Sequence, residues 1–149
     1  AAVLLERARS AGAPVIHVQH DDGPGSLYDV NGYTGAIVDR VAPLEAEPIV
    51  VKNYPNAFVQ TELQDRLASL GVQNLVLAGF MTHMCVNSTA RGAFNLGYAP
   101  TVVANATATR ALPGVDREPV SASAIQAASL AAIADLFAVV VPDAADIPG

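Results

Sequence analysis

Runs of consecutive apolar residues alternate along this chain with segments whose apolar residues recur at helical spacing. Strands without polar alternation are buried on both faces, so this order predicts an α/β fold with a mostly parallel sheet. The runs predict strands at residues 14–20, 49–52, 74–80, 101–104 and 137–141. The spaced segments predict helices at residues 1–11, 83–96 and 120–136, and one more around Leu63, Leu67 and Leu70. Thr61 is the expected cap of that last helix, and Gly71 its end.

The carboxyl ends of parallel strands are where such folds place their sites. Three segments follow strand ends here: the long loop at residues 21–47, the segment 52–58, and the turn 80–85. A loop as long as the first one is usually functional in a compact domain. We therefore look for chemistry at this edge of the sheet.

Composition narrows the class of protein. The 149 residues suit one domain, residues 1–149, and 52% of them are hydrophobic while 15% are charged. A net charge of −6 with no basic cluster argues against nucleic acid or an anionic membrane as a partner. One cysteine fits a reducing compartment, and no secretory signal opens the chain, so the expected location is cytoplasmic.

Two residues occur once each: Cys85 is the only cysteine, and Lys52 is the only lysine. Cys85 falls in the first turn of a predicted helix, where the positive end of the helix dipole favours a thiolate over a thiol. By position alone, Cys85 reads as a small buried residue and Lys52 as a lysine leaving a strand for solvent. Their joint placement at one edge of the sheet favours a nucleophile and its partner.

The sequence GFMTHMCVNSTAR at residues 79–91 resembles the nucleophile motif of the isochorismatase-like cysteine hydrolase superfamily. VKNYPNAF at residues 51–58 is similar to that superfamily's lysine segment. The resemblance implies a three-layer α/β/α fold and an Asp–Lys–Cys triad, with Cys85 as nucleophile and Lys52 supporting its thiolate. It also implies a cis peptide bond between Phe80 and Met81, with the Met81 and Cys85 N–H groups facing an oxyanion.

The aspartate of this triad lies, in the superfamily, on a first strand that precedes the first helix. Neither that strand nor the aspartate is present in residues 1–149, so we expect the catalytic Asp to lie outside this chain and the domain to lack its first strand. Asp21 and Asp22 follow a different strand, and loop capping explains them better than a role as general base.

The remaining candidates concern the substrate pocket: His20, Asp22, Phe58, His83 and Met84. Part of the loop, at residues 20–26, is similar to streptothricin-hydrolase-like proteins. His17 and His20 are three apart on a strand and so point to opposite faces, which argues against a shared metal. We expect no metal and no organic cofactor.

The function predicted is hydrolysis of a C–N amide bond in a small molecule through a thioester. Two alternatives stay open: vinyl-ether hydrolysis of the isochorismatase type, which does not need the cysteine, and a catalytically idle ligand-binding scaffold. The resemblance also implies a homo-oligomer, a dimer or higher.

Overall fold

Two parallel sheets form the centre of the computed structural model, which describes residues 1–147. In the first, β1 (His17–His20) pairs with β2 (Ile49–Lys52). In the second, β3 (Asn74–Phe80), β4 (Ala99–Ala108) and β7 (Val139–Val141) pair in that order. The predicted mostly parallel α/β fold is confirmed. The prediction of one continuous sheet is not confirmed, because no strand in the described range pairs with both β1 and β3. The last two residues of the predicted domain lie outside this range.

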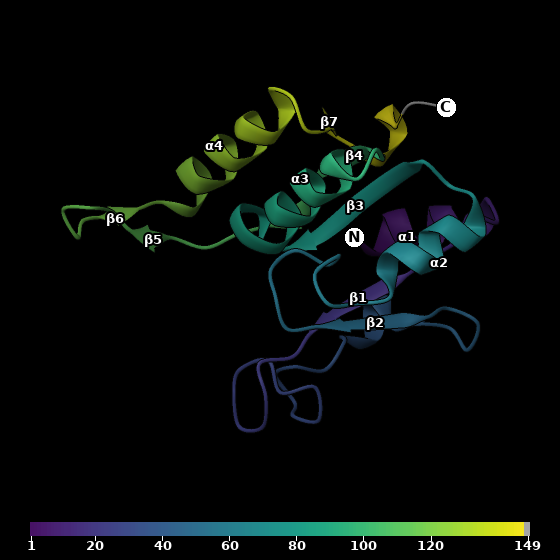
Figure 1. Cartoon of the computed structure of the whole chain (residues 1–149). Coiled ribbons are helices and arrows are strands. Elements are labelled where there is room, and N and C mark those ends of the chain that lie inside the picture. Colours follow the sequence, from purple (N-terminus) through teal and green to yellow (C-terminus); the bar gives the residue numbers. More distant parts are fainter. Residues whose placement is uncertain (148–149) are drawn as a thin grey trace.

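Four α-helices cover the sheets: α1 (Ala2–Ser10), α2 (Leu63–Leu70), α3 (Asn87–Asn95) and α4 (Ala122–Ala134). Figure 1 shows α3 and α4 on one side of β3 and β4, with α1 and α2 on the other. Short 3₁₀ turns, η1 (Asp39–Val41) and η3 (Ala144–Asp146), complete the connections. No helix within residues 1–147 combines the length and apolar character that crossing a bilayer requires.

Adjacent valines of β4 show why three layers form. Val102 packs with Val86, Ala90 and Ile133 of the α3 and α4 layer. Val103 points to the opposite face, where Leu4 of α1 packs against its cluster. A third cluster joins α2 to β2 through the side chains of Val50, Ala57, Leu63 and Leu67. The centre of β4 is therefore covered on both faces, as its apolar run predicts, whereas alternate residues of β3, among them Val76 and Phe80, are exposed.

Several boundaries differ from the sequence-based prediction. β4 continues to Ala108 instead of ending at residue 104, because beyond a register shift its Thr107 pairs with Gly79. A hairpin of β5 (Leu112–Pro113) and β6 (Pro119–Val120) follows in a region expected to be loop. Helix α2 has Glu62 as its N-cap, one residue later than predicted, although Thr61 Oγ1 still accepts a hydrogen bond from the N–H of Leu63.

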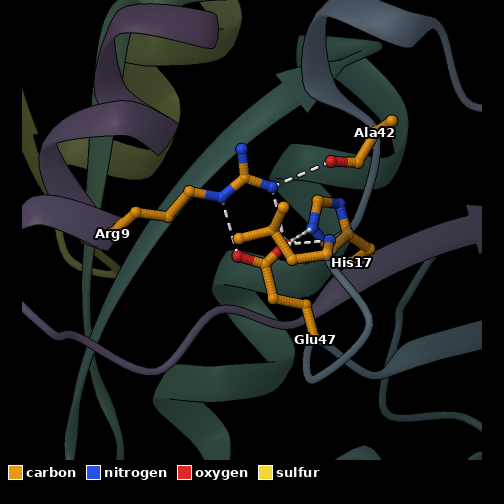
Figure 2. Close-up of polar contacts among 5 residues, drawn as sticks. Arg9, His17, Ala42 and Glu47 are labelled. Carbon is orange, nitrogen blue, oxygen red and sulfur yellow. Dashed lines mark hydrogen bonds and ion pairs between the residues drawn. The ribbon is translucent and has the colours of Figure 1, made fainter.

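The long loop is anchored at the amino end of β1 by Glu47. Its carboxylate accepts two hydrogen bonds from Arg9 of α1, both 2.7 Å, and lies 2.8 Å from His17 Nε2 (Figure 2). Arg9 also donates to the Ala42 carbonyl oxygen at 2.8 Å. The Arg9 guanidinium is the main reason that the pKa of Glu47 is well below its ordinary value. This network joins α1, the loop and β1 at the end of the sheet opposite to the strand ends discussed below.

Candidate active site

Lys52 and Cys85, which the sequence singles out, meet in the structure. Lys52 ends β2, and Cys85 lies in η2 (Thr82–Val86), a π-helical turn between β3 and α3. The Lys52 Nζ atom lies 3.3 Å from the Cys85 Sγ atom. The lysine is only 3% exposed, so its ammonium group is held at the end of the strand and not in solvent.

Three acceptors surround the Lys52 ammonium group and use its three hydrogens. Besides Cys85 Sγ, they are His20 Nδ1 and the Tyr54 carbonyl oxygen, each at 2.9 Å. Within residues 1–147, no carboxylate lies within 4 Å of this ammonium group. Because burying a charge without a counter-charge costs several kcal/mol, the site favours a negative charge on the sulfur.

His20 reaches Lys52 because the two residues are register partners in the parallel pair of β1 and β2. Its ring also contacts Tyr28 edge-on, with the centroids 5.2 Å apart. Partial burial, with a smaller contribution from the Lys52 ammonium, lowers the pKa of His20, and the opposing effects of Asp22 and Asp21 do not cancel it. The histidine is therefore neutral at physiological pH.

Two hydrogen bonds fasten the turn that carries Cys85 to the end of β4. The buried Thr82 hydroxyl donates to the Ala108 carbonyl oxygen at 3.0 Å, and His83 Nδ1 lies 2.6 Å from Thr109 Oγ1. Although threonine is a common helix cap, the Thr82 side chain makes this contact to β4 and does not cap η2, whose N-cap residue is Met81. The peptide bond between Phe80 and Met81 is cis.

The lysine segment is joined directly to the helix behind the cysteine. The Thr89 hydroxyl of α3 accepts a hydrogen bond from the Ala57 N–H at 3.1 Å, and Ala57 is 1% exposed. One turn later, Gly92 lets the Asn56 side chain approach so closely that an added Cβ would lie 2.5 Å from its Nδ2. These contacts fix Lys52 and Cys85 relative to each other.

The other predicted pocket residues are distributed unevenly. His20 lies at the lysine, and Met84 is exposed within the cysteine turn. Phe58 stacks on Tyr98 and packs against the core, which makes it part of the interior. Asp22 is exposed, and its only effect on the site is a weak electrostatic one on His20.

Sequence reasoning missed two contributors. Tyr54 acts through its backbone carbonyl, which no side-chain pattern reveals. Thr109 follows directly after a parallel strand, but the sequence pattern ends that strand at residue 104 instead of Ala108 and so hides this position. Residues 1–147 contain no group of three or more His, Cys, Asp or Glu side chains placed to hold a metal ion.

Comparisons with known proteins agree with this geometry. A family model described as the isochorismatase domain matches residues 1–145. The chain is 39% identical to the Bacillus subtilis isochorismatase family protein YddQ, over 94% of this chain and 78% of that protein. It is similar to the crystal structure of an isochorismatase from Pseudomonas putida KT2440, with a TM-score of 0.93 and 39% identity, covering 99% of this chain and 75% of the other.

Named hydrolases with other reactions are also similar to this chain. Streptothricin hydrolase from Streptomyces noursei is 34% identical over 97% of this chain and 58% of its own length. Ureidoacrylate amidohydrolase from Stutzerimonas stutzeri is 37% identical over 56% of this chain and 34% of its own length. The resemblance of residues 51–58 and 79–91 is thereby confirmed, and the chain belongs to the isochorismatase family of hydrolases.

Proposed function

We propose that this protein is a cysteine-nucleophile hydrolase that cleaves a C–N amide bond in a small molecule. The observation that carries the proposal is the contact between the buried Lys52 ammonium group and the sulfur of the only cysteine, at 3.3 Å. A thiolate is the reactive form of cysteine, and a neighbouring cation stabilises it. The similarity to an amidohydrolase supports an amide as the substrate.

In the proposed reaction, Cys85 and the backbone around it carry out the covalent steps. The Cys85 sulfur attacks the substrate carbonyl carbon, and the carbonyl π electrons move to the oxygen. In the proposal, the backbone N–H groups of Met81 and Cys85 hold this oxyanion. When the oxyanion collapses, the C–N bond breaks, and the amine leaves with the proton that the thiol lost. Water then attacks the thioester, releasing the acid and restoring the thiol.

Proton transfer needs a base, which the proposal assigns to an aspartate outside residues 1–149. It takes the thiol proton, passes it to the amine, and later deprotonates the attacking water. His20 cannot substitute readily, because its Nδ1 lone pair already accepts from Lys52.

The test compares natural full-length protein with its Cys85→Ala and Cys85→Ser variants on a panel of small amides and N-carbamoyl compounds. Amine or ammonia release is measured, and mass spectrometry of quenched reactions detects the acyl group on Cys85. We expect the wild type to form this adduct and both variants to lose turnover while keeping their circular dichroism spectra. Amide hydrolysis that survives Cys85→Ala would rule out the cysteine as nucleophile.

Vinyl-ether hydrolysis is the second candidate, since the similar Pseudomonas putida protein is named an isochorismatase. That reaction does not require a thiolate, so the contact between the buried Lys52 ammonium group and Cys85 argues against it. Isochorismate consumption that is unchanged in Cys85→Ala, together with no amide turnover, would favour it. An idle scaffold predicts neither activity in the wild type.

A further inference from the structure

We infer that His20 is a positioning residue for Lys52: a neutral imidazole, protonated on Nε2, whose Nδ1 lone pair holds the ammonium group against the Cys85 sulfur. This inference concerns the geometry of the site that the proposed function uses, but its test does not require turnover. It also changes the role expected for His20 from a wall of the substrate pocket to a partner of the lysine.

The direction of the hydrogen bond determines the tautomer. The Lys52 ammonium group has only donors, so at 2.9 Å the His20 Nδ1 atom must be the acceptor. A neutral imidazole carries one proton, which must then sit on Nε2. A protonated ring would place an N–H against the ammonium group, so the observed contact requires a neutral histidine.

The other groups around His20 agree with a neutral ring. Burial, followed by the Lys52 ammonium, lowers its pKa, while Asp22 and Asp21 act in the opposite direction. Tyr28 contacts the ring by its edge. Within residues 1–147 no group is hydrogen-bonded to His20 Nε2. This atom is accessible to solvent, so its proton faces water.

A neutral acceptor does what a carboxylate at this position could not do. A carboxylate would pair with the ammonium group and cancel the charge that acts on the sulfur. The imidazole and the Tyr54 carbonyl oxygen instead fix two of the three ammonium hydrogens and leave its full charge. The third hydrogen then points to Cys85 Sγ. The two acceptors thus orient the Lys52 ammonium group without neutralising its charge.

Histidine tautomers are read directly from two-bond ¹H–¹⁵N correlations of the imidazole rings in natural full-length protein, and the His20 signals are assigned by their loss in His20→Leu. We expect His20 to be the Nε2–H tautomer at neutral pH. The second readout is the rate at which iodoacetamide alkylates Cys85, measured by mass spectrometry of the peptide that contains it. This rate follows the thiolate fraction.

His20→Leu removes the acceptor, whereas His20→Asn keeps an acceptor, Oδ1, near the position of Nδ1. We expect His20→Leu to slow alkylation about tenfold at neutral pH, the factor expected for one hydrogen bond to a charged group. His20→Asn should recover most of this loss. His17→Leu is the matched control, because His17 lies on the same strand but contacts Glu47 instead of Lys52, and it should leave alkylation unchanged.

An Nδ1–H tautomer of His20, or equal alkylation rates for His20→Leu, His20→Asn and wild type, would overturn the inference. Equal slowing by His17→Leu and His20→Leu would also overturn it, since it would indicate general loosening of β1. If the amide assay fails while the tautomer and alkylation results hold, only the proposed reaction is wrong. If the amide assay succeeds without them, only the role of His20 is wrong.

Discussion

Replacing Thr89 by Val tests the junction between the lysine segment and the cysteine helix. The two side chains have nearly the same shape, so the change removes one hydroxyl and opens no cavity. The hydroxyl accepts from the Ala57 N–H at 3.1 Å, and Ala57 is 1% exposed, so water cannot replace it. An unsatisfied buried donor costs about 1–3 kcal/mol. The second contact of this hydroxyl, to the Pro55 carbonyl oxygen, is 3.5 Å long and adds little.

We therefore expect Thr89→Val to lower the free energy of unfolding by about 2 kcal/mol. With a urea m-value of about 2 kcal/mol/M, the midpoint of unfolding falls by about 1 M while m stays constant. Thr89→Ser keeps the hydroxyl and should lose less than about 1 kcal/mol. Thr101→Val is the matched control, because the Thr101 hydroxyl makes no hydrogen bond within the described residues, and its effect should stay within about 0.5 kcal/mol. Equal midpoints for Thr89→Val and Thr101→Val would refute the reasoning.

Three further changes test other parts of the structure. Gly92→Ala should destabilise the fold by about 1–3 kcal/mol in urea unfolding despite the better helix propensity of Ala, because the new Cβ collides with Asn56; a stabilised variant would contradict the close approach. Thr82→Val should cost about 1 kcal/mol by the same measurement, through the lost hydrogen bond to Ala108, and no loss would show that this bond contributes nothing net. The lowered pKa of Glu47 means that its contribution to stability is complete above its unfolded pKa of about 4.5 and is lost as pH falls further. Unfolding of wild type between about pH 5 and 2 should therefore depend on pH more steeply than that of Glu47→Gln, and parallel curves would exclude this role.

The sequence predicts the parts of the site that depend on element order. Lys52 ends an apolar run and Cys85 follows another, and parallel strand ends share one edge, so their meeting follows from pattern and resemblance together. Contacts that depend on backbone atoms or on register were beyond this reasoning. The Tyr54 carbonyl oxygen leaves no trace in residue types, and the partnership of His20 with Lys52 requires the register of β1 on β2.

Side-chain roles are hardest to predict where contacts between distant residues override local sequence preferences. Thr82 has the residue type of a helix cap, yet its hydroxyl bonds to Ala108 because β3 and β4 run on in parallel past their register shift. Phe58 follows the lysine segment and was expected to line a pocket, but Tyr98, forty residues away in sequence, offers it a stacking partner in the core. Both contacts join residues that are far apart in sequence, so the residues next to Thr82 or Phe58 do not reveal them.

Lys52 ends a strand of the first sheet, and Cys85 follows a strand of the second. Within residues 1–147 no backbone ladder joins β1 to β3, so the pair is held by side-chain packing and by hydrogen bonds such as that from the Ala57 N–H to Thr89. Partial unfolding that separates the sheets costs less than global unfolding whenever such units open independently. In the chain of residues 1–149, the reactivity of Cys85 then reports on sheet separation, and at low urea it should change before the circular dichroism signal does. The first cooperative unit lost on denaturation is in that case the site itself.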